Sequence, residues 1–197
     1  RDLGTGDRIV RDGQWGAVAQ PLARKVTGIQ LSIVGLGRVG HAIARRALAF
    51  DMTVHYTDLR EQPQSGYQFV PDLIALAECS DVLILAASAD QGSAIITSEV
   101  LTALGPNGYL INVARGKLVD EQALIAALRD KVIAGAGLDV FVDEPHVPEA
   151  LRVLDNVVLQ PHRASATEQT RLAMGEIVLA NLKACFAGET LPTAVTC

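Results

Sequence analysis

Aromatic and basic residues are scarce in this sequence. Phe, Trp and Tyr make up 4% of its 197 residues, and 17 Lys and Arg face 22 Asp and Glu, for a net charge of -5. The basic residues form no cluster of the kind that binds nucleic acid. No apolar run approaches the ~20 residues that cross a bilayer, and no signal peptide is visible. We therefore expect neither nucleic acid nor a membrane among the partners.

Cysteine is also rare. Cys79, Cys185 and Cys197 are odd in number and widely spaced, without the spacing of metal ligands. This pattern predicts no metal site and no disulfide framework. Unpaired thiols are typical of a reducing compartment, so we expect the protein to be cytoplasmic.

The abundant residues are Ala, Val, Leu and Ile, which contribute most of the 49% hydrophobic content. Such a composition is typical of a buried parallel sheet covered by helices. Expected strands and helices alternate along the chain, which predicts a doubly wound α/β fold. The expected strands are residues 31–34, 53–57, 67–69, 82–86, 109–113, 133–140 and 157–159. The expected helices are residues 41–50, 71–78, 97–104, 120–130 and 167–187.

A glycine-rich turn, Gly35-x-Gly37-x-x-Gly40, joins the first expected strand to the first expected helix. The first glycine permits a sharp turn, the second lets the backbone approach a pyrophosphate, and the third lets the helix pack closely. The N-terminus of the helix that follows offers unpaired N–H groups and a partial positive charge to the phosphates, and we include Arg38 and Val39 of the turn among the cofactor-binding residues. The pattern favours a Rossmann-type dinucleotide site over a glycine turn in some other α/β domain.

The acid that ends the second strand bears on the choice of cofactor. Asp58 lies 18 residues after Gly40, near the roughly 20-residue offset of an acid that binds a ribose hydroxyl. A carboxylate there repels a 2′-phosphate, so NAD(H) is favoured. Arg60 could still reach a phosphate if Asp58 turned away, which leaves NADP(H) open.

Polar clusters follow three of the later strands, at residues 112–116, 139–145 and 160–165. Each has an ordinary explanation: a surface arginine, a polar loop, and a structural histidine after a proline. Because the carboxyl ends of parallel strands share one edge of the sheet, we expect a cation, a carboxylate and an imidazole around one crevice.

The same segments carry a family resemblance. Residues 38–58, 112–120, 135–141, 144–145 and 161–162 closely resemble the D-isomer-specific 2-hydroxyacid dehydrogenases, over a match from about Arg8 to the C-terminus. Residues 161–167 are most similar to the glyoxylate/hydroxypyruvate reductase branch. That branch often prefers NADP(H), with a small residue followed by Arg where this chain has Asp58-Leu59-Arg60.

The resemblance implies roles for individual residues. Arg115 would hold the substrate carboxylate, His162 would be the acid/base, and Glu144 would stabilise its imidazolium, with Asp143 as a competing carboxylate. Asp139 would contact the nicotinamide end. The cofactor-binding residues that we predict are Gly35, Gly37, Arg38, Val39, Gly40, Asp58, Ala87, Ala114 and Asp139. The substrate would be a small 2-oxo acid such as glyoxylate or hydroxypyruvate.

The resemblance also predicts the domain organisation. Because the chain begins with Arg1 rather than Met, we expect a portion of a longer protein. Residues 1–27 would be a linker helix end and an arm bearing Trp15, and residues 28–165 the dinucleotide-binding domain. Residues 166–197 would be a helix and tail returning to a largely missing substrate domain. An arm of this kind favours a homodimer, and without the substrate domain we expect dinucleotide binding with little turnover.

Two other functions stay open at this point. Related proteins with this fold act as transcriptional corepressors and retain the Arg, Glu and His. A dinucleotide-sensing interaction module is therefore the alternative to an enzyme. Another family member, such as a phosphoglycerate, formate or phosphite dehydrogenase, is the second alternative.

Overall fold

The computed structural model of the chain describes residues 2–88 and 93–194. Two compact units are present, Arg1–His162 and Arg163–Cys197, and each is described by itself. The expected loop over residues 87–92 falls mostly outside the described residues, and so does Cys197.

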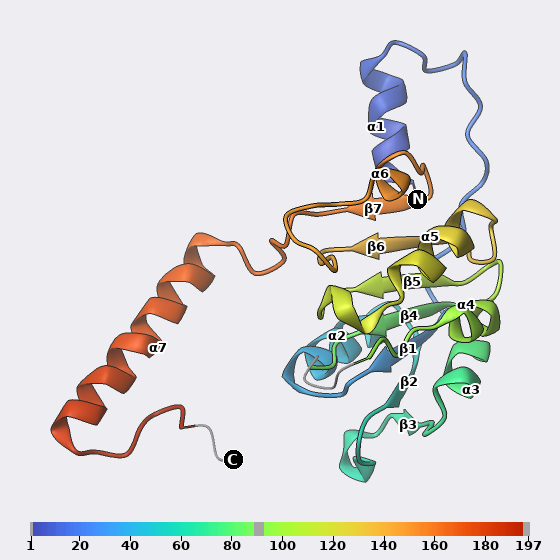
Figure 1. Ribbon diagram of the computed structural model, residues 1–197. Helices are drawn as coiled ribbons and strands as arrows, with labels where there is room; N and C mark the ends of the chain where they lie inside the picture. Colours follow the sequence, from blue (N-terminus) through green and yellow to red (C-terminus); the bar gives the residue numbers. More distant parts are fainter. Residues whose placement is uncertain (1, 89–92, 195–197) are drawn as a thin grey trace. The chain divides into compact units, whose positions relative to one another are not determined.

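Seven parallel strands form one sheet in the first unit, in the order β3-β2-β1-β4-β5-β6-β7 (Figure 1). Strand β1 lies between β2 and β4, so the strand order reverses at β1. This confirms the predicted doubly wound α/β fold of Rossmann type, and the reversal marks where such sheets bind ligands. The strands are β1 (Gln30–Val34), β2 (Thr53–Thr57), β3 (Gln68–Phe69), β4 (Val82–Leu85), β5 (Tyr109–Asn112), β6 (Gly135–Leu138) and β7 (Val157–Leu159).

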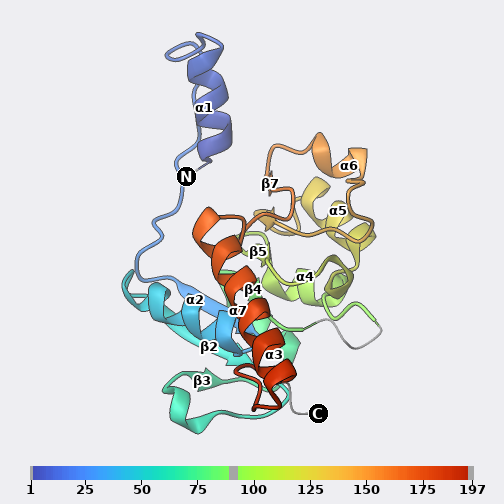
Figure 2. The ribbon, with the colours of Figure 1, turned by 90° about the vertical axis from the view of Figure 1, so that its left-hand side faces the viewer.

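Helices cover both faces of this sheet. Helix α2 (Arg38–Leu48) packs on β1 and β2, whereas α3 (Leu73–Glu78), α4 (Ser98–Leu104) and α5 (Glu121–Arg129) pack side by side on the other face (Figure 2). Alternate residues of β1 and β4 therefore enter two different apolar clusters. Leu31 and Ile33 pack in the cluster of α2, and Leu83 and Leu85 in the cluster of the other three helices. Burial on both faces holds the strand ends, and with them the site, in fixed positions.

Several element boundaries differ from the sequence prediction. Helix α2 begins at Arg38 rather than at residue 41, because its first turn is exposed and the apolar pattern starts only at Gly40. Strand β6 is shorter than the predicted strand of residues 133–140. Ile133 and Val140 are buried like strand residues, but they belong to the turns before and after the strand. Helix α6 (Glu149–Arg152) was not predicted; four residues are too few for a helical pattern.

The remaining helices begin and end the chain. Helix α1 (Leu3–Arg11) precedes the arm, in which Trp15 is 85% exposed. Helix α7 (Glu168–Ala187) starts after Thr167, whose hydroxyl accepts a hydrogen bond from the N–H of Thr170. No helix within residues 2–88 and 93–194 is both long and apolar enough to cross a membrane.

Candidate functional site

The glycine-rich turn lies at the reversal of the strand order. Gly35 follows β1 with φ at +91°, and a Cβ on it would lie 2.5 Å from the Cα of Ala87, which follows β4. A Cβ on Gly40 would clash with the carbonyl oxygen of Gly35. The structure therefore brings three of the predicted cofactor residues together, and two of them have to be glycine for steric reasons.

Gly37 differs from the other two glycines. It is the N-cap of α2 with φ at -78°, and no heavy atom lies within 4 Å of where its Cβ would be. Arg38 and Val39 start the helix with exposed side chains. The space beside Gly37 and the N–H groups of the first helical turn fit a pyrophosphate, which a helix N-terminus stabilises.

Asp58 lies at the end of β2, against the glycine-rich turn. Its Oδ2 accepts a hydrogen bond from the backbone N–H of Leu36 at 2.8 Å, and its Oδ1 one from that of Leu59 at 2.7 Å. The sequence predicted an acid beside the dinucleotide but gave no sign of these backbone contacts. They hold a negative charge at the edge of the turn.

Arg115 follows β5 in a loop that a buried asparagine holds in shape. Asn112 is 1% exposed, and its Nδ2 donates to the carbonyl oxygen of Arg115 at 2.9 Å. Its Oδ1 accepts from the N–H of Ala114 at 3.0 Å. Sequence reasoning placed Asn112 in the motif but did not assign it a role. The available signal was an asparagine ending an otherwise apolar strand.

His162 and Glu144 form a hydrogen-bonded pair. The Nδ1–H of His162 donates to Glu144 Oε2 at 2.7 Å, and the N–H of Phe141 donates to Oε1 at 3.0 Å. Both bonds lower the pKa of Glu144, and the bond from His162 has the larger effect. The charge of Arg115 acts in the same direction. Asp143, the competing carboxylate, instead lies 3.7 Å from the ring of His146.

The backbone of His162 is itself unusual. Its φ is +47°, in the left-handed region that side chains other than glycine and asparagine rarely adopt. Such strain is most common at functional sites, where the surrounding structure over-determines the conformation. Within the described residues Arg115 makes no hydrogen bond to either member of the pair; it donates to the carbonyl oxygen of Ala114 at 2.6 Å.

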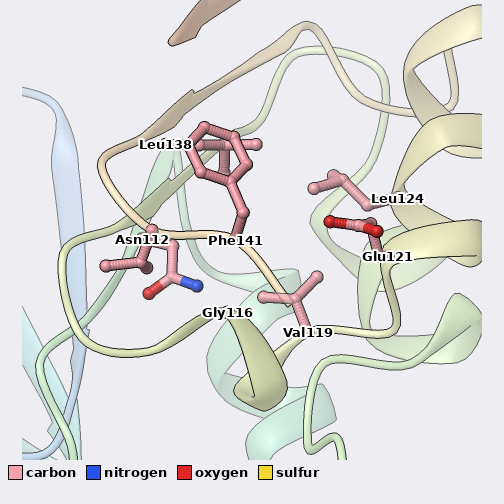
Figure 3. Close-up of a pocket in the computed structure, with 8 residues that line it drawn as sticks. Asn112, Gly116, Val119, Glu121, Leu124, Leu138 and Phe141 are labelled. Carbon is pink, nitrogen blue, oxygen red and sulfur yellow. The ribbon is translucent and has the colours of Figure 1, made fainter. Parts of the chain in front are cut away.

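The loops after β5 and β6 touch directly. A Cβ on Gly116 would overlap the backbone carbonyl group of Phe141, so only glycine permits this approach. Figure 3 shows both residues at a small pocket, with Asn112 beside them. The lining is mostly apolar and does not include Arg115, Glu144 or His162. We assign the pocket to loop packing rather than to substrate.

Asp139 lies beside this loop contact. It follows β6, is 8% exposed, and donates its backbone N–H to the carbonyl oxygen of Asn112 at 3.0 Å. Among residues 2–88 and 93–194, no group of three or more His, Cys, Asp or Glu side chains is placed to hold a metal ion.

Replacing Asn112 with Ala is expected to lower the free energy of unfolding by about 1–3 kcal/mol, because the buried N–H of Ala114 and the partly buried carbonyl group of Arg115 lose their partner. Urea unfolding measures this change. Asn107, whose side chain is exposed, provides the control: Asn107→Ala should change the value by less than about 0.5 kcal/mol. Equal small losses in both variants would show that Asn112 does not hold the loop.

Comparison with known proteins gives a consistent result. The family model described as "D-isomer specific 2-hydroxyacid dehydrogenase, NAD binding domain" matches residues 1–164. A 2-ketogluconate reductase of Gluconobacter oxydans is 48% identical over 196 residues, which are 99% of this chain and 63% of that protein. A glyoxylate/hydroxypyruvate reductase of Arabidopsis thaliana is 46% identical over 96% of this chain and 61% of its own length.

Solved structures agree with the sequence matches. An NADPH-dependent glyoxylate/hydroxypyruvate reductase from Sinorhizobium meliloti, in complex with NADP and malonate, has a TM-score of 0.91 at 44% identity, over 100% of this chain and 62% of that one. A 2-hydroxyacid dehydrogenase from Lactobacillus delbrueckii in its NAD-complexed form has a TM-score of 0.87 at 28% identity, over 100% and 65% of the two chains. The chain thus spans less than two thirds of these relatives.

Proposed function

The chain belongs to the D-isomer specific 2-hydroxyacid dehydrogenase family, and on this premise we propose that the protein transfers a hydride between a nicotinamide cofactor and a small 2-oxo or 2-hydroxy acid. Glyoxylate and hydroxypyruvate are the substrates we favour, because reductases named for them are among the relatives. Within the protein, residues 28–165 would be the dinucleotide-binding domain. The matched residues cover the cofactor-binding portion of such an enzyme.

The observation that carries the proposal is the pair of His162 and Glu144, 2.7 Å apart at the carboxyl edge of the sheet. Because Nδ1 is engaged by the carboxylate, Nε2 is the nitrogen left to face substrate. Glu144 stabilises the imidazolium form, so the ring can give a proton to the C2 oxygen of a 2-oxo acid. The bound nicotinamide supplies or receives the hydride at C2.

Arg115 is the group we propose for the substrate carboxylate. Its planar guanidinium offers paired N–H donors that match the two oxygens of a carboxylate. After the hydrogen bonds from His162 and Phe141, the charge of Arg115 also lowers the pKa of Glu144, which supports its closeness to the acid/base pair. Asn112 fixes the loop, and we propose that Asp139 and Ala114 face the nicotinamide end of the cofactor.

Titration of the chain with NADH and NADPH, followed by nucleotide fluorescence, tests the proposal. We expect the chain alone to bind nucleotide. On adding glyoxylate or hydroxypyruvate we expect slow or no loss of the absorbance of the reduced nicotinamide. The full-length protein should turn over. Failure to bind either nucleotide would contradict the proposed site, and turnover of neither acid by the full-length protein would contradict the proposed reaction.

We propose that NAD(H) is preferred to NADP(H), because the fixed charge of Asp58 repels a 2′-phosphate. Replacing Asp58 with Ser should shift the ratio of the two dissociation constants about tenfold or more towards NADP(H). Competitive titration measures the ratio. An unchanged ratio would remove Asp58 from the ribose site, and Arg60 is the exposed cation available to a phosphate.

We also propose a homodimer and a cytoplasmic location. The arm exposes Trp15, and a large aromatic side chain of this kind is typical of interface anchors. Cys79 and Cys185 are unpaired thiols, which suit a reducing compartment. Sedimentation of the wild type and of a Trp15→Ser variant tests the dimer, since the variant should dissociate at a higher protein concentration.

A further inference from the structure

The side chain of Gln62 joins three parts of the dinucleotide site that are distant in sequence. Its Nε2 donates to the carbonyl oxygen of Leu36 at 3.1 Å and to Oδ2 of Asp58 at 3.3 Å. Its Oε1 accepts from Nε2 of His41, on α2, at 3.2 Å. One amide therefore links the glycine-rich turn, the acid after β2, and the helix that follows the turn.

Only one orientation of this amide is compatible with its neighbours. The Leu36 carbonyl oxygen and the Asp58 carboxylate are both acceptors, so they require the NH₂ group. His41 supplies an N–H to the oxygen on the other side. Rotating the amide by half a turn would set an oxygen against two oxygens. All three contacts therefore favour the same rotamer.

The backbone of Gln62 is anchored as firmly as its side chain. Its N–H donates to the hydroxyl oxygen of Tyr56 at 2.7 Å, and Tyr56 is fully buried in β2. The Tyr56 ring packs against Phe69 of β3, with centroids 5.3 Å apart. The residue whose side-chain amide contacts Asp58 is thus itself held by the core of the sheet.

We propose that Gln62 is a positioning residue that holds the Asp58 carboxylate in place and thereby sets the preference between NAD(H) and NADP(H). This inference rests on the proposed function. Without Gln62, Oδ2 of Asp58 loses one of its two donors and keeps only the N–H of Leu36, so the carboxylate can exchange that bond for water and turn away from the ribose side. Turning away weakens the contact with ribose hydroxyls and reduces the repulsion of a 2′-phosphate.

Gln62→Leu and Gln62→Met both remove the side-chain hydrogen bonds at similar volume, and neither adds a charge. Each variant should weaken NADH binding about tenfold and lower the ratio of the NADPH to the NADH dissociation constant about fivefold. The matched control is Gln64→Leu, because Gln64 lies exposed in the short 3-10 helix η1 (Pro63–Ser65), which Gln62 caps. The control should leave both constants within about twofold of the wild type.

A double-mutant cycle with Asp58→Ser separates positioning from general destabilisation. If Gln62 acts through Asp58, adding Gln62→Leu or Gln62→Met to Asp58→Ser leaves the ratio unchanged. An equal shift of the ratio in both backgrounds, or none in the wild-type background, overturns the inference. If the wild-type chain binds neither nucleotide, the proposed function itself is overturned. If the chain binds nucleotide but substitution of Gln62 changes neither dissociation constant, only the inference about Gln62 is overturned.

Discussion

Replacing His162 with Asn is expected to lower the kcat of the full-length protein about 10³-fold, within the range for loss of a general acid/base. The dissociation constant of NADH should stay within about twofold, because the proposed dinucleotide contacts come from other residues. Asparagine is the informative substitute at this position. It tolerates the left-handed backbone, with φ at +47°, but cannot transfer the proton.

Glu144, the carboxylate hydrogen-bonded to His162, gives the matching control. Glu144→Gln keeps an acceptor for the Phe141 N–H but removes the charge beside the imidazole. We expect kcat to fall about 10–100-fold, less than for His162→Asn, since the ring remains able to transfer a proton. Stopped-flow mixing of enzyme, NADH and hydroxypyruvate measures both variants. A His162→Asn enzyme that retains near-normal kcat would assign the proton transfer to another group.

The sequence located the polar groups of this site, but only the family resemblance favoured Glu144 over Asp143 as the partner of His162. Strand ends in a parallel sheet meet at one edge, so Arg115, Glu144 and His162 could be expected near one another from order alone. Which of two adjacent carboxylates lies against His162 depends on loop geometry. Asp143 and Glu144 differ by one position, and only the structure shows that Phe141 orients Glu144 and leaves Asp143 near His146.

Residues that act through backbone groups were the hardest to predict. Asn112 and Gln62 carry no charge and belong to no reactive pair, so residue type alone gives them no role. Their importance comes from main-chain atoms that meet them in space, at Ala114 and Arg115 in one case and at Leu36 in the other. No spacing rule records such contacts, because they depend on how two loops pack.

The fold was more predictable than the site, and for a physical reason. The bounds of β2 and β7 match the prediction: β2 buries Val54 and Tyr56 inside the sheet, and the edge strand β7 is an apolar run although Val158 is 60% exposed. The helix α2 was misplaced at its start because Gly37 caps it without a side chain, leaving no capping signal in the sequence. The same lack of a side chain is what opens the space beside the helix N-terminus.

Gly37→Ala should therefore weaken NADH binding about 10–100-fold, because the added methyl group occupies the space proposed for the pyrophosphate. The fold should tolerate this change. The backbone of Gly37, with φ at -78°, suits any residue, and nothing lies within 4 Å of the new Cβ. We expect the free energy of unfolding to stay within about 0.5 kcal/mol of the wild type. Nucleotide titration and urea unfolding of one preparation measure both quantities.

Gly35→Ala is the contrasting variant. Its Cβ would meet the backbone of Ala87 at 2.5 Å, with φ at +91°, so stability should fall by about 3 kcal/mol or more. Gly35→Ala would then lower both NADH affinity and stability, whereas Gly37→Ala would lower NADH affinity alone. Wild-type affinity in Gly37→Ala would mean that the phosphates do not approach this helix N-terminus. A loss of stability equal to that of Gly35→Ala would mean that the space beside Gly37 is needed by the fold and not by a ligand.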